Sequence, residues 1–361
     1  MSARPPSRPP DSRPPLASPA RWSTAADRVA VVVNGKAKQV TEELVETLEQ
    51  IVQSGDLFVS RSLEEGRDIA RVIVERGYPT VLTGGGDGTF VQMVSWIAKV
   101  ADALKKPLPR FGLLKLGTGN AMAWVLGAGQ QHRGVVADLA RLRSEGGSRE
   151  LKLIEIEEML TPFAGLGADA VALGHQRRTR EALEKVPGLR KVANGPVTYT
   201  LSMLGLSLPR FLLAPKPRFR VVNDGAPAQR LGDDGRPVGG DIATGDVLFD
   251  GPAHLLMFGS IPYWGFGARV FPFAEERPDR FNLRVIAFGS VEAVAHVRGI
   301  WRGTHRSERV HDFLVEAVRI ECTPPTPLQI GGYPVGERSV VRARLSPRPI
   351  RVVDYYAPPP M

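Results

Sequence analysis

The strongest constraint on the fold of this sequence is an alternation of strand-like and helix-like segments between residues 29 and 142. The strand-like segments are short, apolar and partly β-branched, as buried parallel strands are, and they span residues 29–33, 57–60, 80–83 and 111–116. The helix-like segments have apolar residues three and four apart, over residues 41–54, 62–76, 90–104, 121–126 and 135–142. This alternation predicts a parallel sheet covered by helices, with ligands bound beyond the carboxyl ends of the strands.

The pattern changes near Leu151, where strand-like segments begin to dominate. They span residues 151–156, 219–222, 254–258, 281–288, 315–320 and 340–345, with a turn-rich stretch over 223–246. This half is predicted to form an antiparallel β-sandwich. The sequence therefore predicts an α/β fold class with two domains, an N-terminal parallel-sheet domain over 29–148 and a C-terminal β-rich domain over 149–345.

Composition limits the remaining possibilities. Residues 1–28 form a Pro/Arg-rich tail that we expect to be disordered. A single cysteine, Cys322, excludes an internal disulfide framework. No uninterrupted run of 18 apolar residues and no secretory apolar region is found, so we expect a soluble, cytoplasmic protein.

The formal net charge of +9 is compatible with a nucleic acid, an anionic membrane surface or a phosphorylated ligand as partner. Charge alone does not choose among these partners. The sequence has no recognisable basic and aromatic nucleic-acid module, so no nucleic-acid partner is expected.

Two glycine-rich segments carry the candidate chemistry, and each follows a predicted strand and precedes a predicted helix. They are TGGGDGT at 83–89 and LGTGN at 116–120. Glycines let backbone amides approach a phosphate, and a helix N-terminus favours an anion there. Asp87 is a candidate to orient a metal or a nucleophile, and Thr89 or Thr118 to donate to phosphate oxygens. The alternative is two turns whose glycines only supply positive φ, but two such segments at successive strand ends favour a phosphate site.

GGGDGT followed by LGTGN resembles the diacylglycerol kinase catalytic domain of bacterial lipid kinases of the diacylglycerol and sphingosine kinase type. The shorter GGDGT is shared with NAD kinases and phosphofructokinases, whereas the second segment and the β-rich half favour the lipid kinases. The resemblance implies ATP- and Mg²⁺-dependent phosphorylation of a hydroxyl of diacylglycerol or a related lipid, in a cleft between the two domains. It also implies that a last strand near 350–353, within residues 346–356, returns to the first domain.

The resemblance implies which residues hold ATP. Asn34 and Lys36 fall in the family's opening nucleotide-contacting turn. Ser62 falls where the family has a nucleotide-binding Ser or Thr, although Ser62 and Glu65 also have the spacing of a capping box. The other predicted ATP-binding residues are Gly84, Gly85, Gly86, Asp87, Gly88, Thr89, Gln92, Gly117, Thr118, Gly119 and Asn120. Asp87 is the predicted catalytic residue, and no metal ligands are assigned.

Acidic residues that the family usually carries are replaced or shifted in this sequence. The family's Asp-Gly-Glu of the late β domain corresponds here to Gly331, Gly332 and Tyr333, and a phenol is a poor base at neutral pH. Glu337 is a candidate substitute. The Asp that normally follows LGTGN is Ala121, and Asp279 lies one residue out of register with the family's metal-linked Asp. Two alternatives to a lipid kinase therefore stay open, a kinase of a soluble substrate such as NAD and a non-catalytic nucleotide-binding or regulatory protein.

The expected partner is a lipid substrate at the membrane surface. The most apolar segment, residues 197–214, is flanked by basic residues and suits either core packing or peripheral contact with the inner membrane face. The sequence leaves a homodimer open.

Overall fold

The computed structural model describes residues 28–35, 37, 40, 42–52, 56–117, 119–129, 131–142, 147–168, 170, 216–289, 292 and 295–356. The predicted tail before Arg28 and the apolar segment 197–214 lie outside these residues. The chain divides into two compact units, unit 1 with residues 1–151 and 349–361 and unit 2 with residues 152–348. No helix in the described part of the chain is long and apolar enough to cross a membrane.

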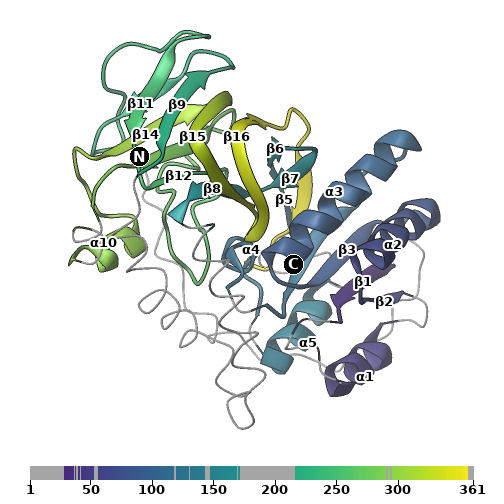
Figure 1. The fold of residues 1–361 in the computed structure, drawn as a ribbon. Helices are drawn as coiled ribbons and strands as arrows, with labels where there is room; N and C mark the ends of the chain where they lie inside the picture. Colours follow the sequence, from purple (N-terminus) through teal and green to yellow (C-terminus); the bar gives the residue numbers. More distant parts are fainter. Residues whose placement is uncertain are drawn as a thin grey trace. The chain divides into compact units, whose positions relative to one another are not determined.

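Unit 1 contains a six-stranded sheet with the strand order β2-β1-β3-β4-β17-β5. The neighbouring strands β2, β1 and β3 are labelled in Figure 1. The strands are β1 (Val29–Asn34), β2 (Leu57–Ser60), β3 (Thr80–Gly85), β4 (Arg110–Lys115), β5 (Ser148–Leu151) and β17 (Ile350–Val353). All neighbours pair in parallel except β5, which is antiparallel to β17. The predicted parallel α/β sheet is confirmed, and β17 brings the end of the chain back between β4 and β5.

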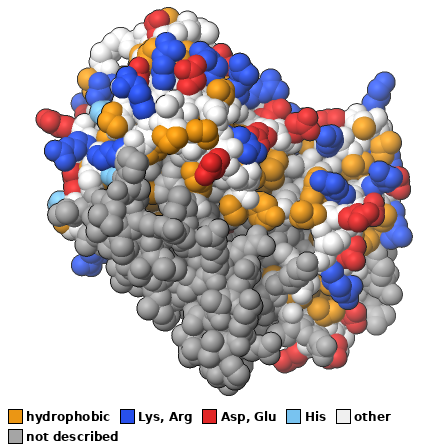
Figure 2. Space-filling model, viewed as in Figure 1, with side chains coloured by type: hydrophobic (Ala, Val, Ile, Leu, Met, Phe, Trp, Pro, Cys, Tyr) orange, Lys and Arg blue, Asp and Glu red, His pale blue; other side chains and the backbone are white. Residues whose placement is uncertain are grey.

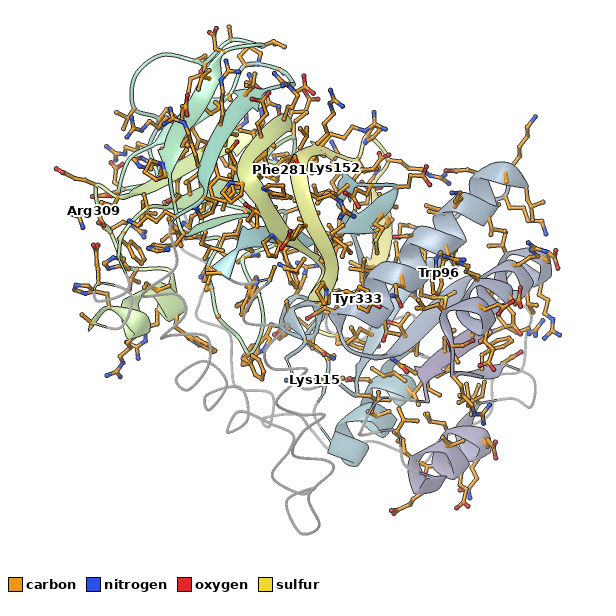
Figure 3. The ribbon with its side chains drawn as sticks, viewed as in Figure 1. Trp96, Lys115, Lys152, Phe281, Arg309 and Tyr333 are labelled. Atoms are coloured by element: carbon orange, nitrogen blue, oxygen red, sulfur yellow. The ribbon has the colours of Figure 1, made fainter. Side chains whose placement is uncertain are left out.

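Five helices accompany this sheet. They are α1 (Glu42–Ile51), α2 (Leu63–Arg76), α3 (Asp87–Ala103), α4 (Ala121–Leu126) and α5 (Gln131–Leu142). Helix α2 shows how local sequence sets a boundary, because the Ser62 hydroxyl accepts a hydrogen bond from the Glu65 amide at 3.1 Å and Gly77 ends the helix with φ 68°. Helices α2 and α3 pack together, and the Cα of Gly66 lies against the Trp96 ring, where a Cβ would be 2.5 Å from Cζ3 (Figure 3).

The connection between β3 and α3 differs from the prediction. We expected the strand to end at Thr83 and the helix to begin at Phe90, with a glycine loop between them. In the structure β3 continues to Gly85 and α3 begins at Asp87, so Gly86 alone connects them. Gly84 and Gly85 pair with Leu114 and Lys115 of β4, and this sheet pairing overrides the low strand propensity of glycine.

Unit 2 is an antiparallel β domain, as predicted. Its described strands form one 11-stranded sheet with the order β10-β14-β13-β12-β8-β15-β16-β6-β7, and β9 joins β15 to β11. The first strands are β6 (Ile154–Ile156), β7 (Met159–Thr161), β8 (Phe163–Gly167), β9 (Arg218–Asn223), β10 (Gln229–Leu231) and β11 (Val247–Pro252). The remaining elements are β12 (Leu255–Gly259), β13 (Phe281–Ile286), α10 (Val297–Arg302), β14 (Val310–Val315), β15 (Ala317–Ile330) and β16 (Tyr333–Leu345).

Two of the predicted strands are each divided in the structure. The single strand expected over 151–156 is two strands in different sheets, because Leu151 pairs with Ile350 in unit 1 whereas Ile154 pairs with Thr161 and Leu345 in unit 2. The strand expected over 315–320 is divided at Glu316, between β14 and β15. Apolar patterning marks extended segments, but it does not show which sheet an extended segment joins.

Basic side chains on the surface of unit 2 are interspersed with acidic ones (Figure 2). Several form ion pairs, including Arg218 with Asp250, Arg220 with Glu321 and Arg344 with Glu155. Some of the basic side chains of unit 2 are therefore engaged by neighbouring carboxylates.

Candidate functional site

The candidate site of unit 1 begins where β3 meets α3. Gly86 is the N-cap of this 17-residue helix, with φ −89° and ψ 179°, and no side chain caps the helix there. The first-turn amides of an uncapped helix are hydrogen-bond donors without intrahelical partners, and the helix dipole adds positive potential. This end of α3 is therefore suited to an anion.

The two glycine segments are in direct contact. A Cβ on Gly117 would lie 2.6 Å from the Gly86 Cα, 2.8 Å from the Gly86 nitrogen and 2.3 Å from Oδ1 of Asn120. Gly84 is similarly enclosed, with a Cβ position 2.8 Å from Val33 and 2.9 Å from Leu116. Glycine at 84 and 117 is therefore explained by close packing of the strand ends.

The described residues give no such explanation for Gly86. Its φ of −89° is ordinary for any residue, and among the described atoms a Cβ there would meet only Asn120 Oδ1, at 3.8 Å. None of the described glycines in either segment has a positive φ, so the alternative of two plain turns does not account for them. The open space over Gly86 lies beside the uncapped amides of α3, where a bound group would need the absence of a side chain.

Asp87 joins the two segments. Its carboxylate accepts hydrogen bonds from the amides of Ala121, at 2.7 Å to Oδ2, and Met122, at 2.9 Å to Oδ1. The side chain is buried, and desolvation raises the pKa of this carboxyl to about 7, although the two amide hydrogen bonds oppose that shift. Asp87 therefore anchors the first turn of α4 to the first turn of α3.

Two asparagines complete the polar framework. Asn34 Nδ2 donates to Oγ1 of Thr89 at 3.3 Å, which links the end of β1 to α3. Asn120 Nδ2 donates to the Gly85 carbonyl at 2.8 Å, while its Oδ1 is buried without a hydrogen-bond partner. The structure therefore brings Asn34, Gly84–Thr89, Gly117 and Asn120 together at the carboxyl end of the parallel strands.

The other predicted nucleotide contacts are less well defined. Ser62 caps α2, so its structural role is established, while a nucleotide contact stays a prediction. Gln92 is half-buried in the second turn of α3, and Gly119 is half-buried in the second segment. Lys36 and Thr118 lie outside the described residues.

Sequence reasoning missed Lys115, the last residue of β4. Lys115, labelled in Figure 3, pairs with Gly85 and immediately precedes the LGTGN segment. Its ammonium lies 5.2 Å from the centroid of the Trp124 ring. The available signal was a lysine that directly follows the apolar residues Leu113 and Leu114 and directly precedes a glycine segment.

The unit 2 positions that the family resemblance links to acids lie in the β15–β16 hairpin and around Asp279. Gly331 and Gly332 form the two-residue turn of the β15–β16 hairpin, with φ 57° and 81°, as in a type I′ turn. Tyr333 and Glu337 are exposed on β16. Asp279 is bound by Arg277 and Arg280, and the hydrogen bond from Arg277 is the main cause that lowers the pKa of this carboxyl.

The donor atoms at the α3 site do not fit a Mg²⁺ ion held by protein side chains. Mg²⁺ prefers several oxygen ligands in octahedral geometry. Both Asp87 oxygens accept backbone amides, Asn120 Oδ1 is one isolated buried acceptor, and the helix terminus beside it favours anions. No cluster of three or more His, Cys, Asp or Glu residues suited to a metal is found in the described part of the chain.

Comparison with known proteins agrees with this geometry. Residues 28–155 match the family model described as "Diacylglycerol kinase catalytic domain". A curated relative from Chromohalobacter salexigens, "Probable lipid kinase YegS-like", is 33% identical over 100 residues, which are 27% of this chain and only 31% of that relative.

Solved structures from Bacillus anthracis str. Sterne share the fold. "A putative diacylglycerol kinase" has a TM-score of 0.60 at 13% identity, and a second chain, "a diacylglycerol kinases", has a TM-score of 0.55 at 12% identity. Each comparison covers 91% of this chain and 97% of the solved chain. At such identities the likeness concerns the fold, whereas the family model concerns the sequence that builds the site. Residues 28–155, which contain both glycine segments, therefore match the diacylglycerol kinase catalytic domain family in sequence.

Proposed function

We propose that this protein is an ATP-dependent lipid kinase that transfers the γ-phosphate to a hydroxyl of diacylglycerol or a related lipid. The observation that carries the proposal is the space over Gly86, which lies at the uncapped end of α3 and which no contact within the described protein requires. A phosphate group in this space would accept hydrogen bonds from first-turn amides of α3.

The residues of this chain would act mainly by positioning, which is the principal requirement of phosphoryl transfer. The amides at Gly86 to Gly88 would bind phosphate oxygens, and the Thr89 hydroxyl, held by Asn34, lies one residue further into the helix. Mg²⁺ accompanying ATP would be held largely by the phosphates and water, since the described residues offer it no ready set of ligands.

Asp87 is the proposed catalytic residue. A carboxyl whose pKa is raised to about 7 is partly ionised at neutral pH, as a general base should be. Each carboxylate oxygen has two acceptor positions, so the hydrogen bonds from Ala121 and Met122 leave capacity for a substrate hydroxyl. The same hydrogen bonds fix the orientation of the carboxylate.

The test begins with Gly86→Ser. Serine is a favourable N-cap, so this variant should keep or raise the stability of the protein, while its side chain fills the proposed phosphate space. We expect calorimetry to show ATP binding weakened at least about tenfold, the equivalent of one good hydrogen bond. Unchanged ATP affinity in a folded variant would contradict the proposed site.

Activity is measured as transfer of labelled γ-phosphate from ATP into mixed vesicles of diacylglycerol, ceramide and sphingoid bases. Label in lipid with the wild type, and none with Gly86→Ser, supports the lipid kinase and identifies the lipid. Parallel reactions with NAD as the acceptor test a soluble substrate. Label in NAD but not in lipid would overturn the lipid assignment.

The second candidate is a nucleotide-binding protein without kinase activity. It is favoured by the β15–β16 hairpin, where the two positions that the family resemblance assigns to acids hold the turn glycine Gly331 and the exposed Tyr333. Under this alternative, the wild type binds ATP and loses affinity in Gly86→Ser, yet transfers no label to any acceptor.

A further inference from the structure

Lys115 is a cationic residue at the carboxyl end of a parallel strand of unit 1. It is the last residue of β4, it is paired in register with Gly85, and it directly precedes the second glycine segment. Its side chain is only partly exposed. The chain therefore places a positive charge at the edge of the sheet where both glycine segments meet.

The positive charge of Lys115 is stabilised by the aromatic ring of Trp124. Its Nζ lies 5.2 Å from the centroid of the Trp124 ring on α4, within the range of a cation–π interaction. Within the described part of the chain, no carboxylate lies within ion-pair distance of this ammonium. Burial lowers the pKa of Lys115, and the nearby Asp87 charge opposes that shift.

Other cations of unit 1 are engaged differently. Arg28 forms an ion pair with Asp56 at 2.5 Å, and Lys106 donates to the carbonyls of Val74 and Glu75 at the C-terminal end of α2. Arg149 donates to the carbonyl of Val125 at 2.6 Å. Lys115 instead donates no hydrogen bond to any described residue, and the Trp124 ring face stabilises its charge without using the N–H groups in conventional hydrogen bonds.

We propose that Lys115 is a phosphate-binding residue, held by Trp124 so that its ammonium contacts the polyphosphate chain of the bound nucleotide. This inference rests on the proposed function, because it places ATP over Gly86. A lysine supplies a compact point charge with three donors, which suits a phosphate group. The amides of α3 and the ammonium of β4 would then bind the same anion from two elements that are joined at Gly85.

The test compares wild type with Lys115→Met, which keeps the length of the side chain and removes its charge. The probes are ATP, inorganic tripolyphosphate and AMP, titrated by calorimetry in Mg²⁺ buffer. We expect the affinity for ATP and tripolyphosphate to fall at least about tenfold, as for a lost charge-assisted hydrogen bond, and the affinity for AMP to change less than about twofold. Lys106→Met, at the opposite edge of the sheet, is the matched control and should bind all three probes as wild type does.

A second measurement does not depend on how Lys115→Met folds. Lysines of the wild-type protein are labelled by reductive ¹³C-methylation, and the Lys115 resonance is assigned by its absence from Lys115→Arg. Tripolyphosphate should raise the pKa of this group, because an adjacent anion favours the charged form. A resonance that titrates identically with and without tripolyphosphate would overturn the proposal.

The outcomes separate this inference from the proposed function. Lys115-dependent binding of polyphosphate without transfer to any lipid supports the inference and contradicts the lipid kinase. Lipid phosphorylation by a folded Lys115→Met variant with wild-type ATP affinity contradicts the inference about Lys115 but supports the proposed kinase function. Absence of tripolyphosphate binding in the wild type also contradicts the inference.

Discussion

The carboxylate of Asp87 accepts a hydrogen bond from the backbone amide of Ala121 at 2.7 Å, and so links the first turns of two helices that follow different strands. A second hydrogen bond, from Met122, uses the other carboxylate oxygen. One side chain of the first glycine segment therefore fixes the helix that follows the second segment.

Replacement of Asp87 by Asn should loosen the start of α4. A carboxamide has one acceptor oxygen and two donor hydrogens, so it cannot accept from both amides as the carboxylate does. We expect amide hydrogen exchange at Ala121 or Met122 to accelerate at least about tenfold, in line with the loss of one hydrogen bond. Asp68→Asn, at an exposed position of α2, is the control and should leave both amides protected.

The raised pKa of Asp87 predicts how stability depends on pH. The carboxyl keeps its proton up to about pH 7 in the folded state but loses it near 3.8 when unfolded. Between these values the folded state binds more protons, so the contribution of Asp87 to stability is greatest below about pH 4 and declines as pH rises to about 7. Urea unfolding at several pH values should show this decline in wild type relative to Asp87→Asn, at no more than about 1.4 kcal/mol per pH unit. A constant difference between the two proteins would refute the assignment.

Gly117→Ala should lower the stability of the folded protein, whereas Gly86→Ser should not. The new Cβ would lie 2.6 Å from the Gly86 Cα and 2.8 Å from its nitrogen, and backbone atoms cannot move aside as a flexible side chain can. We expect Gly117→Ala to lose about 1–3 kcal/mol of stability together with ATP binding. Thermal unfolding and calorimetry check this prediction, and a Gly117→Ala protein as stable as wild type would disprove the close contact.

Gly66→Ala tests the packing of α2 on α3. Alanine normally stabilises a helix by about 1 kcal/mol over glycine, but here its Cβ would lie 2.5 Å from the Trp96 ring. We expect a net loss of about 1–3 kcal/mol in the free energy of unfolding. In a protein that already carries Trp96→Leu, Gly66→Ala should no longer lower the free energy of unfolding. Strictly additive effects of the two substitutions on that free energy would argue against the contact.

Gly332→Ala isolates the backbone requirement of the β15–β16 turn. No atom of the described residues lies within 4 Å of the Cβ position, so we expect the penalty to come from φ 81° and to be about 1–2 kcal/mol. Asn at 332 should lose less, because it tolerates this conformation better. Gly240→Ala, which has open space and no positive φ, serves as the control for urea unfolding and should show no comparable loss.

Much of the fold was predictable because its signals are local. The β-branched run at the start of β1, the Ser62 cap and Gly77 stop of α2, and the strand–helix alternation predicted the parallel sheet. The bounds of β2 and α4 were predicted to the residue. The split of residues 151–156 between two sheets was not predictable, because hydrogen-bond partners such as Ile350 and Thr161 are distant in sequence.

The candidate site likewise has features that the sequence predicts and features that only tertiary contacts set. The sequence by itself determined that two glycine segments end successive strands, since that depends on spacing and periodicity along the chain. Tertiary structure decided what each residue does there: Gly117 is glycine because it touches Gly86, Gly86 faces open space, Asp87 holds α4, and Lys115 rests on Trp124. The contacts of Gly117 with Gly86 and of Asp87 with Ala121 join residues more than 30 positions apart in the sequence. The pairing of β3 with β4 brings these residues together, and no local sequence pattern specifies that pairing.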